Sequence, residues 1–409
     1  MPADSPTAPG YRATLAALSI GQIVNWAALY YAFTAFVLPM QRELGWSKPL
    51  VMGAYTTGLA LSAVLSFPVG AAIDRGQGRT VLALGPLLGG VGFVLWSAAS
   101  APWMLYAAWT VIGVALSMSL YEPAFAVVTQ RYPARFRDAV TTLTLVAGFA
   151  STLAFPSIAA LHAVLPWRGA LLVIGAVLAL AIAPLQWWAL RGVPQEESPS
   201  GLRSVGRGMQ SLAPDMRFDD ALRQRAFWLL TATFTIAMFT AGALWAHMVP
   251  ALAAKGLSEA DALKVLVCVG PSQVLGRLVF LILGRRFSLR VMALVTLTGL
   301  PLGCLLFALG HTLPVLLLFA LVFGMANGVA TLVRGGLLPD YFGRAAIGRI
   351  GGAMSGIAQG ARAAAPLFTA WLLLVLPGYR ELLLFCAAVG LAGWCAFVLA
   401  GRPSRTIGH

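Results

Sequence analysis

The sequence predicts an all-α polytopic membrane protein in which twelve transmembrane helices form two pseudo-symmetric six-helix bundles. Of the 409 residues, 59% are hydrophobic and 10% are charged, whereas about 25% are charged in soluble domains. Apolar runs of about 20 residues, the length that crosses a hydrocarbon core about 30 Å thick, recur along the whole chain. One polar segment divides these runs into six and six.

The apolar runs give the order of the elements. Most turns between them are short, but the sixth run is followed by 191–225, which holds three prolines and eleven charged residues. We therefore expect an N-terminal bundle over 1–190, a cytoplasmic linker over 191–225 and a C-terminal bundle over 226–409. Spans 1 to 12 are expected near 13–38, 50–72, 80–99, 103–129, 139–161, 168–190, 226–250, 261–284, 290–310, 313–333, 348–375 and 381–400.

Basic residues predict the orientation. If both termini are cytoplasmic, twenty arginines fall on the cytoplasmic side and six arginines and lysines on the outer side. This bias is typical of membrane proteins, whose inner turns are rich in positive charge. The chain has three lysines and twenty-five arginines, which is compatible with a GC-rich bacterial genome. We therefore expect a multi-pass protein of the bacterial cytoplasmic (inner) membrane.

The net charge of +14 has the same origin. The basic residues are scattered over turns that meet anionic lipid, and they do not gather on a soluble face that could bind nucleic acid. The four cysteines show no metal-ligand spacing, and no motif indicates a cofactor or an enzyme. The first twelve residues do not resemble a signal peptide. We expect a monomer in the lipid bilayer with a small-molecule substrate.

A sequence repeat supports the two halves. The stretch "PVGAAIDRGQGRTVLALG" ends span 2 and continues into span 3, and "VFLILGRRFSLRVMALVT" ends span 8 and continues into span 9. The two align at an offset of 211 residues, which places Arg79 on Arg290. Parallel repeats of this kind are typical of secondary transporters, in which the substrate site lies between the halves near the middle of the membrane.

The turn after span 2 carries a recognisable motif, formed by Gly70, Asp74, Arg75, Gly78 and Arg79. It resembles the signature loop between helices 2 and 3 of the major facilitator superfamily, roughly Gly-x-x-x-Asp-Arg-x-Gly-Arg-Arg. Here the second glycine comes one place later and Thr80 replaces a basic residue. The resemblance implies a role in switching between inward-closed and outward-closed states. The alternative is an ordinary cytoplasmic turn.

Within that superfamily the chain resembles the bacterial relatives of monocarboxylate transporters and oxalate–formate exchangers. The resemblance rests on the arginine in span 8 and on "YYAFTAFVLPMQRELGWS", "YEPAFAVV" and "TLVRGGLLPDYFG". In the animal carriers of that group an aspartate precedes this arginine by four residues, and here the position is Gln273. The resemblance also implies that spans 8 and 11 each offer a cation to an anionic substrate.

Two arginines fall inside spans. Arg362 lies about twelve residues into span 11, and Ser355, Gln359 and Arg362 share one helical face. An arginine inside a membrane is costly unless it faces water or a partner, so we expect this face to line the cavity; the alternative is a structural ion pair. Arg277 lies seven residues from the end of span 8, one turn after Gln273. We expect Arg277 to contact substrate, and the alternative is an interfacial arginine.

Two further residues are candidates for proton coupling. Glu122 is the one acidic residue placed deep in a span, and it could form a charge pair with an arginine. Burial favours the protonated form of this carboxyl group, whereas a nearby arginine favours its ionised form. A proton-linked switch requires both forms to be accessible. The alternative is a permanent ion pair. His247, near the outer end of span 7, could be a gate or proton site or an ordinary interfacial histidine.

Span 1 has two polar faces, and one of them should face the cavity. Asn25 lies on one, and Tyr30, Tyr31 and Thr34 lie roughly opposite. By resemblance we choose the tyrosines and Thr34, because aromatic walls with hydroxyl groups suit a small ligand. The leading function is therefore a secondary active transporter of a small monocarboxylate-like anion, with proton coupling or exchange. The alternatives are an efflux transporter for drugs or for a neutral toxic species such as arsenite, and a non-transporting sensor or membrane enzyme.

Overall fold

A computed structural model describes residues 9–192, 215–284 and 286–403. Within these ranges the chain is helical and contains no strand. The chain divides into two compact units. Unit 1 contains Met1–Arg217, Pro339–Gly352 and Pro403–His409, and unit 2 contains Phe218–Leu338 and Ala353–Arg402. Residues 339–352, from the C-terminal half of the sequence, thus belong to unit 1.

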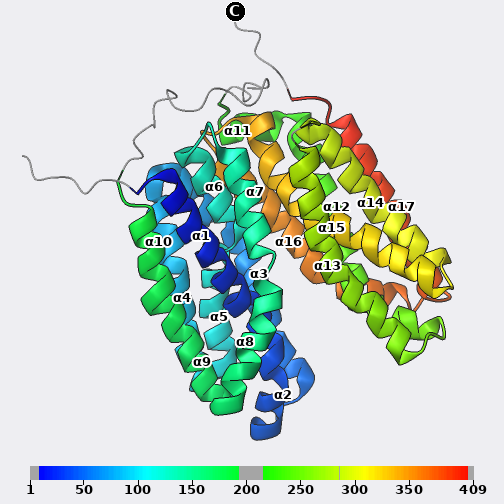
Figure 1. The fold of residues 1–409 in the computed structure, drawn as a ribbon, viewed down its shortest axis with the longest axis horizontal. Coiled ribbons are helices and arrows are strands. Elements are labelled where there is room, and N and C mark those ends of the chain that lie inside the picture. Colours follow the sequence, from blue (N-terminus) through cyan, green and yellow to red (C-terminus); the bar gives the residue numbers. More distant parts are fainter. Residues whose placement is uncertain (1–8, 193–214, 285, 404–409) are drawn as a thin grey trace, which may run out of the picture. The chain divides into compact units, whose positions relative to one another are not determined.

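The α-helices of spans 1 to 6 are labelled in Figure 1. Several are composite, because a π-helical turn or a break interrupts the α-helix. Span 1 is α1 (Tyr11–Asn25), the π-helix η1 (Trp26–Tyr31) and α2 (Ala32–Leu44); span 2 is α3 (Lys48–Ala72) and η2 (Ile73–Gln77); span 3 is α4 (Gly78–Ser97); span 4 is α5 (Pro102–Ser119) and α6 (Tyr121–Arg131); span 5 is α7 (Phe136–Ala147) and α8 (Ala150–Val164); span 6 is α9 (Trp167–Ala176), η3 (Val177–Ile182) and α10 (Ala183–Ala189).

Spans 7 to 12 are single helices. A short helix, α11 (Phe218–Arg223), precedes them. The spans are α12 (Arg225–Ala254), α13 (Glu259–Leu283), α14 (Leu289–Leu309), α15 (Leu313–Phe342), α16 (Ile347–Leu372) and α17 (Tyr379–Leu399).

Hydropathy agrees with this assignment. Nine helical stretches of the described chain are long and apolar enough to cross a membrane. One of them, Pro49–Ser97, has 49 residues and contains spans 2 and 3, which meet at the left-handed turn of Gly76 (φ +84°). Spans 5 and 11 are not among these stretches, because span 5 is interrupted between α7 and α8 and because α16 carries the polar residues Gln359 and Arg362. With these two, the number of spans is twelve. The predicted twelve-helix membrane fold is confirmed.

A shift of 211 residues relates the two halves in structure as well as in sequence. Helices α3 and α13 both have 25 residues, and the shift maps Lys48 onto Glu259 and Ala72 onto Leu283. It also maps the first residues of α4, α5 and α7 onto those of α14, α15 and α16. The halves are therefore repeats of one six-helix topology.

Hydrogen bonds repeat at the same shift. Arg79 Nε donates to Trp187 O at 2.9 Å, and Arg290 donates through a terminal amino group to Val398 O at 3.1 Å. Each arginine also lies over an aromatic ring near that carbonyl, at 3.8 Å from the Trp187 centroid and 5.1 Å from the Phe397 centroid. The start of the third helix is thus tied to the end of the sixth in each repeat.

The other end of the third helix is capped in both repeats. Arg168 donates to the Ser97 and Ala99 carbonyl oxygens at 2.5 and 2.9 Å. Lys255 donates to the Ala308 and Gly310 carbonyl oxygens at 3.2 and 2.8 Å. These acceptors again correspond at 211 residues, although the two cations come from different elements. Cations stabilise helix C-termini, where carbonyl groups lack partners.

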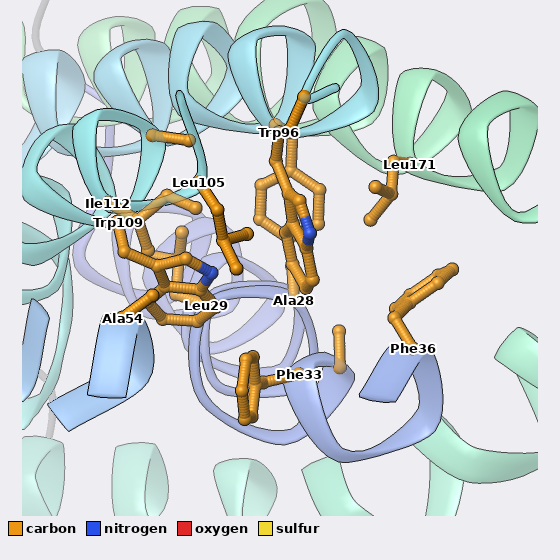
Figure 2. Packing of buried hydrophobic residues seen from close by; sticks show 14 of the residues in the cluster. Ala28, Leu29, Phe33, Phe36, Ala54, Trp96, Leu105, Trp109, Ile112 and Leu171 are labelled. Carbon is orange, nitrogen blue, oxygen red and sulfur yellow. The ribbon is translucent and has the colours of Figure 1, made fainter. Parts of the chain in front are cut away.

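Unit 1 has a core of aromatic rings (Figure 2). Phe33, Trp96 and Trp109 are fully buried. The Trp109 ring lies 5.0 Å from that of Phe33 and 5.2 Å from that of Trp96, both edge to face, an arrangement that aromatic rings favour. Trp96 Nε1 donates to the sulfur of Met40 at 3.0 Å. This core joins spans 1, 3 and 4.

Candidate functional site

Asp74 caps a helix that begins 273 positions later. Its Oδ1 accepts the Gly348 N–H at 2.7 Å, and its Oδ2 accepts the Arg349 N–H at 2.8 Å. Gln130 Nε2 donates to Oδ1 at 3.1 Å, and Arg349 Nε donates to Oδ2 at 3.3 Å. The Asp74 side chain is 3% exposed. Because α16 starts at Ile347, the carboxylate satisfies N–H groups that lack partners inside the helix, and its charge suits the helix N-terminus.

Glycines bring the two backbones together at this clasp, which we define as Asp74, Gly348 and Arg349. A Cβ atom on Gly70 would lie 1.9 Å from Gly348 O, and one on Gly348 would lie 2.2 Å from Gly70 O. Next along α16, a Cβ on Gly352 would lie 2.3 Å from Ser66 O. A larger residue at any of these positions would force α3 and the start of α16 apart.

The remaining residues of the signature-loop motif make different contacts. Gly78 packs on α6, because a Cβ there would lie 2.6 Å from Val127 Cγ2. Arg75 is exposed, and Arg79 binds Trp187 as described. The left-handed turn falls on Gly76, which is not one of the motif residues. The sequence signal for Gly76 is its position in the short turn between two helices. Such a turn often needs a residue with positive φ, which glycine adopts most easily.

A second carboxylate holds the same turn. Asp215 Oδ1 accepts the Arg344 N–H at 2.7 Å, and the Met216 N–H donates to Phe342 O at 3.2 Å. Asp215, Phe342 and Arg344 all belong to unit 1. The end of the polar linker is therefore bound to the turn between α15 and α16. Neither Asp215 nor Gln130 had a local sequence signal.

Arg277 is buried in α13, with 8% of its surface exposed. Its Nε donates to Gly328 O at 3.1 Å. Spans 8 and 10 approach closely there, since a Cβ on Gly328 would lie 2.4 Å from Gln273 O. Gln273, one helical turn before Arg277, is partly buried. The bond to Gly328 uses one of the five N–H donors of a guanidinium group and does not neutralise its charge.

Arg362 is partly buried on α16, beside α12. A Cβ on Gly242 would lie 2.9 Å from Arg362 O and 3.3 Å from its Cγ, so the glycine makes room for the base of this side chain. Ser355 is buried at 3% exposure, and Gln359 is partly buried. The polar face predicted on span 11 therefore includes side chains that differ in exposure.

Tyr30 and Tyr31 lie on the π-helix η1 in a group of aromatic rings. The Trp26 centroid lies 5.1 Å from that of Tyr30, 6.2 Å from that of Tyr31 and 4.9 Å from that of Tyr121. Tyr55 joins them through Tyr30 at 6.3 Å. The side chain of Thr34 lies outside the described part of the structure. π-Helical turns often occur at functional sites, but hydropathy carries no signal for them.

The opposite face of span 1 points into unit 1. Asn25 is fully buried and donates to Ser119 O at 3.3 Å. Tyr30 and Tyr31 are only partly buried. Of the two polar faces of span 1, the face that carries Tyr30 and Tyr31 is therefore the more exposed one.

Glu122 and His247 lie in different units. Glu122 is in the first turn of α6, after a break in span 4, and it is partly buried. His247 Nε2 lies 2.9 Å from Thr369 Oγ1, which joins spans 7 and 11 within unit 2. Thr369 is fully buried and also donates to Ala365 O at 2.6 Å. His247 therefore has a neutral partner.

Comparison with known proteins gives the family. Three solved structures share the fold. The human organic anion transporter MFSD10 (TETRAN) has a TM-score of 0.70 and 16% identity, covering 95% of this chain and 100% of its own. A variant of the E. coli fucose:proton symporter FucP has a TM-score of 0.71 and 14% identity, and FucP in the outward conformation has 0.71 and 13%; both cover 95% of this chain and 98% of theirs.

Sequence comparison agrees with the structural likeness. No curated protein sequence matches the chain. The sequence profile of the Major Facilitator Superfamily, however, matches residues 18–290, well over half of the chain. Its members are membrane transporters that bind small molecules. The chain belongs to the Major Facilitator Superfamily.

Proposed function

We propose that this chain is a secondary active transporter of a small, monocarboxylate-like organic anion. It works by alternating access and is driven by proton coupling or by exchange. The observation that carries the proposal is Arg277, a charged side chain with 8% exposure in an apolar helix. Its hydrogen bond to the neutral Gly328 carbonyl does not balance the positive charge, and none of the described residues forms an ion pair with it.

Electrostatics favours an anion at this position. A charge inside a membrane protein costs several kcal/mol or more unless it meets water or an opposite charge. The planar guanidinium fork binds a carboxylate through two parallel hydrogen bonds, which an ammonium group cannot do. Gln273 and Arg277 lie one turn apart, and Arg362 would supply the second cation. Tyr30, Tyr31 and Thr34 would contact the apolar part of the substrate, and Ser355 and Gln359 would contact its polar part.

The similar structures do not decide the substrate. MFSD10 is described as an organic anion transporter and FucP as a fucose:proton symporter. At 16% and 14% identity, each supports the fold of this chain and no more. The proposal of an anion therefore rests on the arginines. Glu122 and His247 are the proposed sites of proton coupling.

The clasp at Asp74 is proposed as the conformational switch, together with Gly70, Arg75, Gly78 and Arg79. One carboxylate holds the N-terminus of α16, and it can release two backbone N–H groups at once. The proposed setting is a monomer in the bacterial cytoplasmic membrane with both termini in the cytoplasm. The resemblance to the monocarboxylate and oxalate–formate group belongs to the same proposal.

Uptake into proteoliposomes tests the proposal. The purified protein should take up one or more of a panel of radiolabelled carboxylates, and Arg277→Lys should weaken the uptake about tenfold or more while the protein stays folded. Arg223→Lys, an exposed arginine on α11, is the control. Normal carboxylate transport by Arg277→Lys would reject the anion site. Transport of a neutral compound alone would favour the alternative, efflux of drugs or of a neutral toxic species such as arsenite.

A further inference from the structure

Span 4 is broken between α5 and α6, and the sequence explains the break. In an α-helix the Ser119 carbonyl would accept the N–H of the residue four positions later, which is Pro123. Proline has no N–H, and its ring clashes with that carbonyl. The chain leaves the helical conformation at Leu120 (φ −84°, ψ −160°), and α6 begins at Tyr121. Backbone groups freed inside a membrane protein need new partners.

Two amide side chains of span 1 supply partners for this carbonyl. Gln22 Nε2 donates to Ser119 O at 2.8 Å, and Asn25 Nδ2 donates to it at 3.3 Å. Both side chains are fully buried. Since each amide uses its nitrogen here, its carbonyl oxygen is left to accept a hydrogen bond from a further group.

No residue in the described part of the chain provides that further group. Gln22 Oε1, Asn25 Oδ1 and Ser119 Oγ are buried and have no hydrogen-bond partner among the described residues. Trp26 Nε1 is a buried donor that also has no hydrogen-bond partner among the described residues. The Trp26 ring centroid lies 4.9 Å from that of Tyr121, the first residue of α6. An unmet buried polar group costs about as much as a lost hydrogen bond. Four of them around one helix break indicate a ligand.

We propose that the break in span 4 holds an internal water site, lined by Gln22, Asn25, Ser119 and Trp26. The mixture of groups selects the ligand. The two amide oxygens would repel an anion, whereas the indole N–H and the positive N-terminus of α6 oppose a cation. Water both donates and accepts, and buried waters make about three hydrogen bonds each. The site lies inside unit 1 and does not depend on which substrate is carried.

The water site gives span 4 a hinge that need not lose hydrogen bonds when it bends. A water molecule can follow the Ser119 carbonyl and the two amide oxygens through a change of angle at Leu120, which fixed side-chain partners cannot do as easily. Glu122 lies three residues beyond Ser119, so a sodium ion is the competing occupant and the experiment must distinguish it.

Removing one hydroxyl group tests the site by the sign of a stability change. If water binds Ser119 Oγ, Ser119→Ala loses that hydrogen bond and the midpoint of thermal unfolding should fall by about 2–4 °C. If the hydroxyl is unsatisfied, its removal should raise the midpoint or leave it unchanged. Ser117→Ala is the matched reference, because it loses one known hydroxyl hydrogen bond, from Ser117 Oγ to Val114 O at 2.7 Å; Ser119→Ala should lower the midpoint by a similar amount. An unchanged or raised midpoint in Ser119→Ala overturns the proposal.

Hydroxyl-radical labelling gives an independent measurement. Radicals formed from internal water oxidise neighbouring side chains that bulk solvent does not reach. Leu120, at 6% exposure beside the break, should be labelled several-fold faster than Leu105, a fully buried leucine of the aromatic core. Equal labelling overturns the water site. A saturable rise of the midpoint with Na⁺, absent in Ser119→Ala, would show that a cation occupies the site and would also overturn it.

Discussion

The Asp74 carboxylate and the Gly348 N–H are joined by a hydrogen bond of 2.7 Å, although 274 residues separate them. The other carboxylate oxygen accepts the next N–H, that of Arg349. One side chain therefore fixes two successive backbone groups at the start of span 11. The bond is local in space and remote in sequence, so a change at either end should affect the other.

The charge of Asp74 is the first feature to test. Asp74→Asn keeps one acceptor oxygen but presents an N–H₂ group to one of the two backbone donors. We expect slower transport with nearly unchanged substrate affinity, because Asp74 bonds to Gln130 and to the first N–H groups of α16 and is not among the residues proposed to bind substrate. Equilibrium binding and transport rate are measured on the same preparation. Asp220→Asn, an exposed residue of α11, is the control. A large loss of affinity with normal turnover would contradict the prediction.

The glycine contact at the clasp should be sensitive to a single methyl group. Gly348→Ala would place a Cβ 2.2 Å from Gly70 O, a backbone atom that cannot move alone. We expect a lower unfolding midpoint and weaker transport. Gly360→Ala is a matched control in the same helix, because a Cβ there meets nothing within 4 Å. Alanine has the higher helix propensity, by about 1 kcal/mol, so the control should be as stable as the parent. Equal stability of both variants would refute the contact.

The cap at the end of α14 should contribute measurable stability. Lys255→Met removes two hydrogen bonds, to the Ala308 and Gly310 carbonyl oxygens. Bonds to charged groups contribute about 1.5–3 kcal/mol each when buried, and partial solvation reduces this, so we expect a loss of about 1–2 kcal/mol. Lys264→Met is the control, since Lys264 is exposed and pairs only with Asp261 among its described neighbours. Thermal unfolding of both variants checks the difference.

The orientation is tested by labelling from the two sides of the membrane. Single cysteines replace Arg207 in the polar linker and Ala254 at the end of α12, in a background without the four native cysteines. The positive-inside bias predicts that an impermeant maleimide reaches the two positions from opposite sides. Labelling of both positions from the same side would reject the proposed topology.

The sequence predicted the spans well and the contacts poorly. Long apolar runs and the 211-residue repeat are regular patterns, and they placed all twelve helices. The break at Leu120 was missed, although Pro123 marks a carbonyl without a donor, because an apolar run continues through it. The π-helix at Trp26–Tyr31 has no hydropathy signal at all.

The candidate residues show the same contrast. A motif marked Asp74 and an apolar background marked Arg277, since charge inside a span is conspicuous. Their partners, Gly348 and Gly328, are ordinary glycines among many in this chain. A hydrogen bond to a backbone group across tens or hundreds of residues leaves no pattern in one sequence. These partners therefore become apparent only in the folded structure.

The last prediction concerns how Arg277 is positioned. Gly328 accepts the Arg277 Nε–H, and a Cβ on Gly328 would lie 2.4 Å from Gln273 O and 2.8 Å from its Cα. Gly328→Ala should therefore displace span 8 from span 10 and move the guanidinium group without removing its charge. We expect weaker binding of the carboxylate identified by uptake. Gly270→Ala in the same span 8 is the control, because a Cβ there meets nothing within 4 Å.

A double-mutant cycle separates positioning from general damage. If Gly328 acts on binding through Arg277, then Gly328→Ala should weaken carboxylate binding about tenfold in the parent protein and much less in an Arg277→Lys background, since coupled residues are not additive. General damage would lower binding by the same factor in both backgrounds. Unfolding midpoints of all four proteins show whether each is folded at the temperature of the assay. Equal factors would mean that the Gly328 carbonyl does not position the arginine, and that the bond at 3.1 Å is a structural contact between spans 8 and 10 alone.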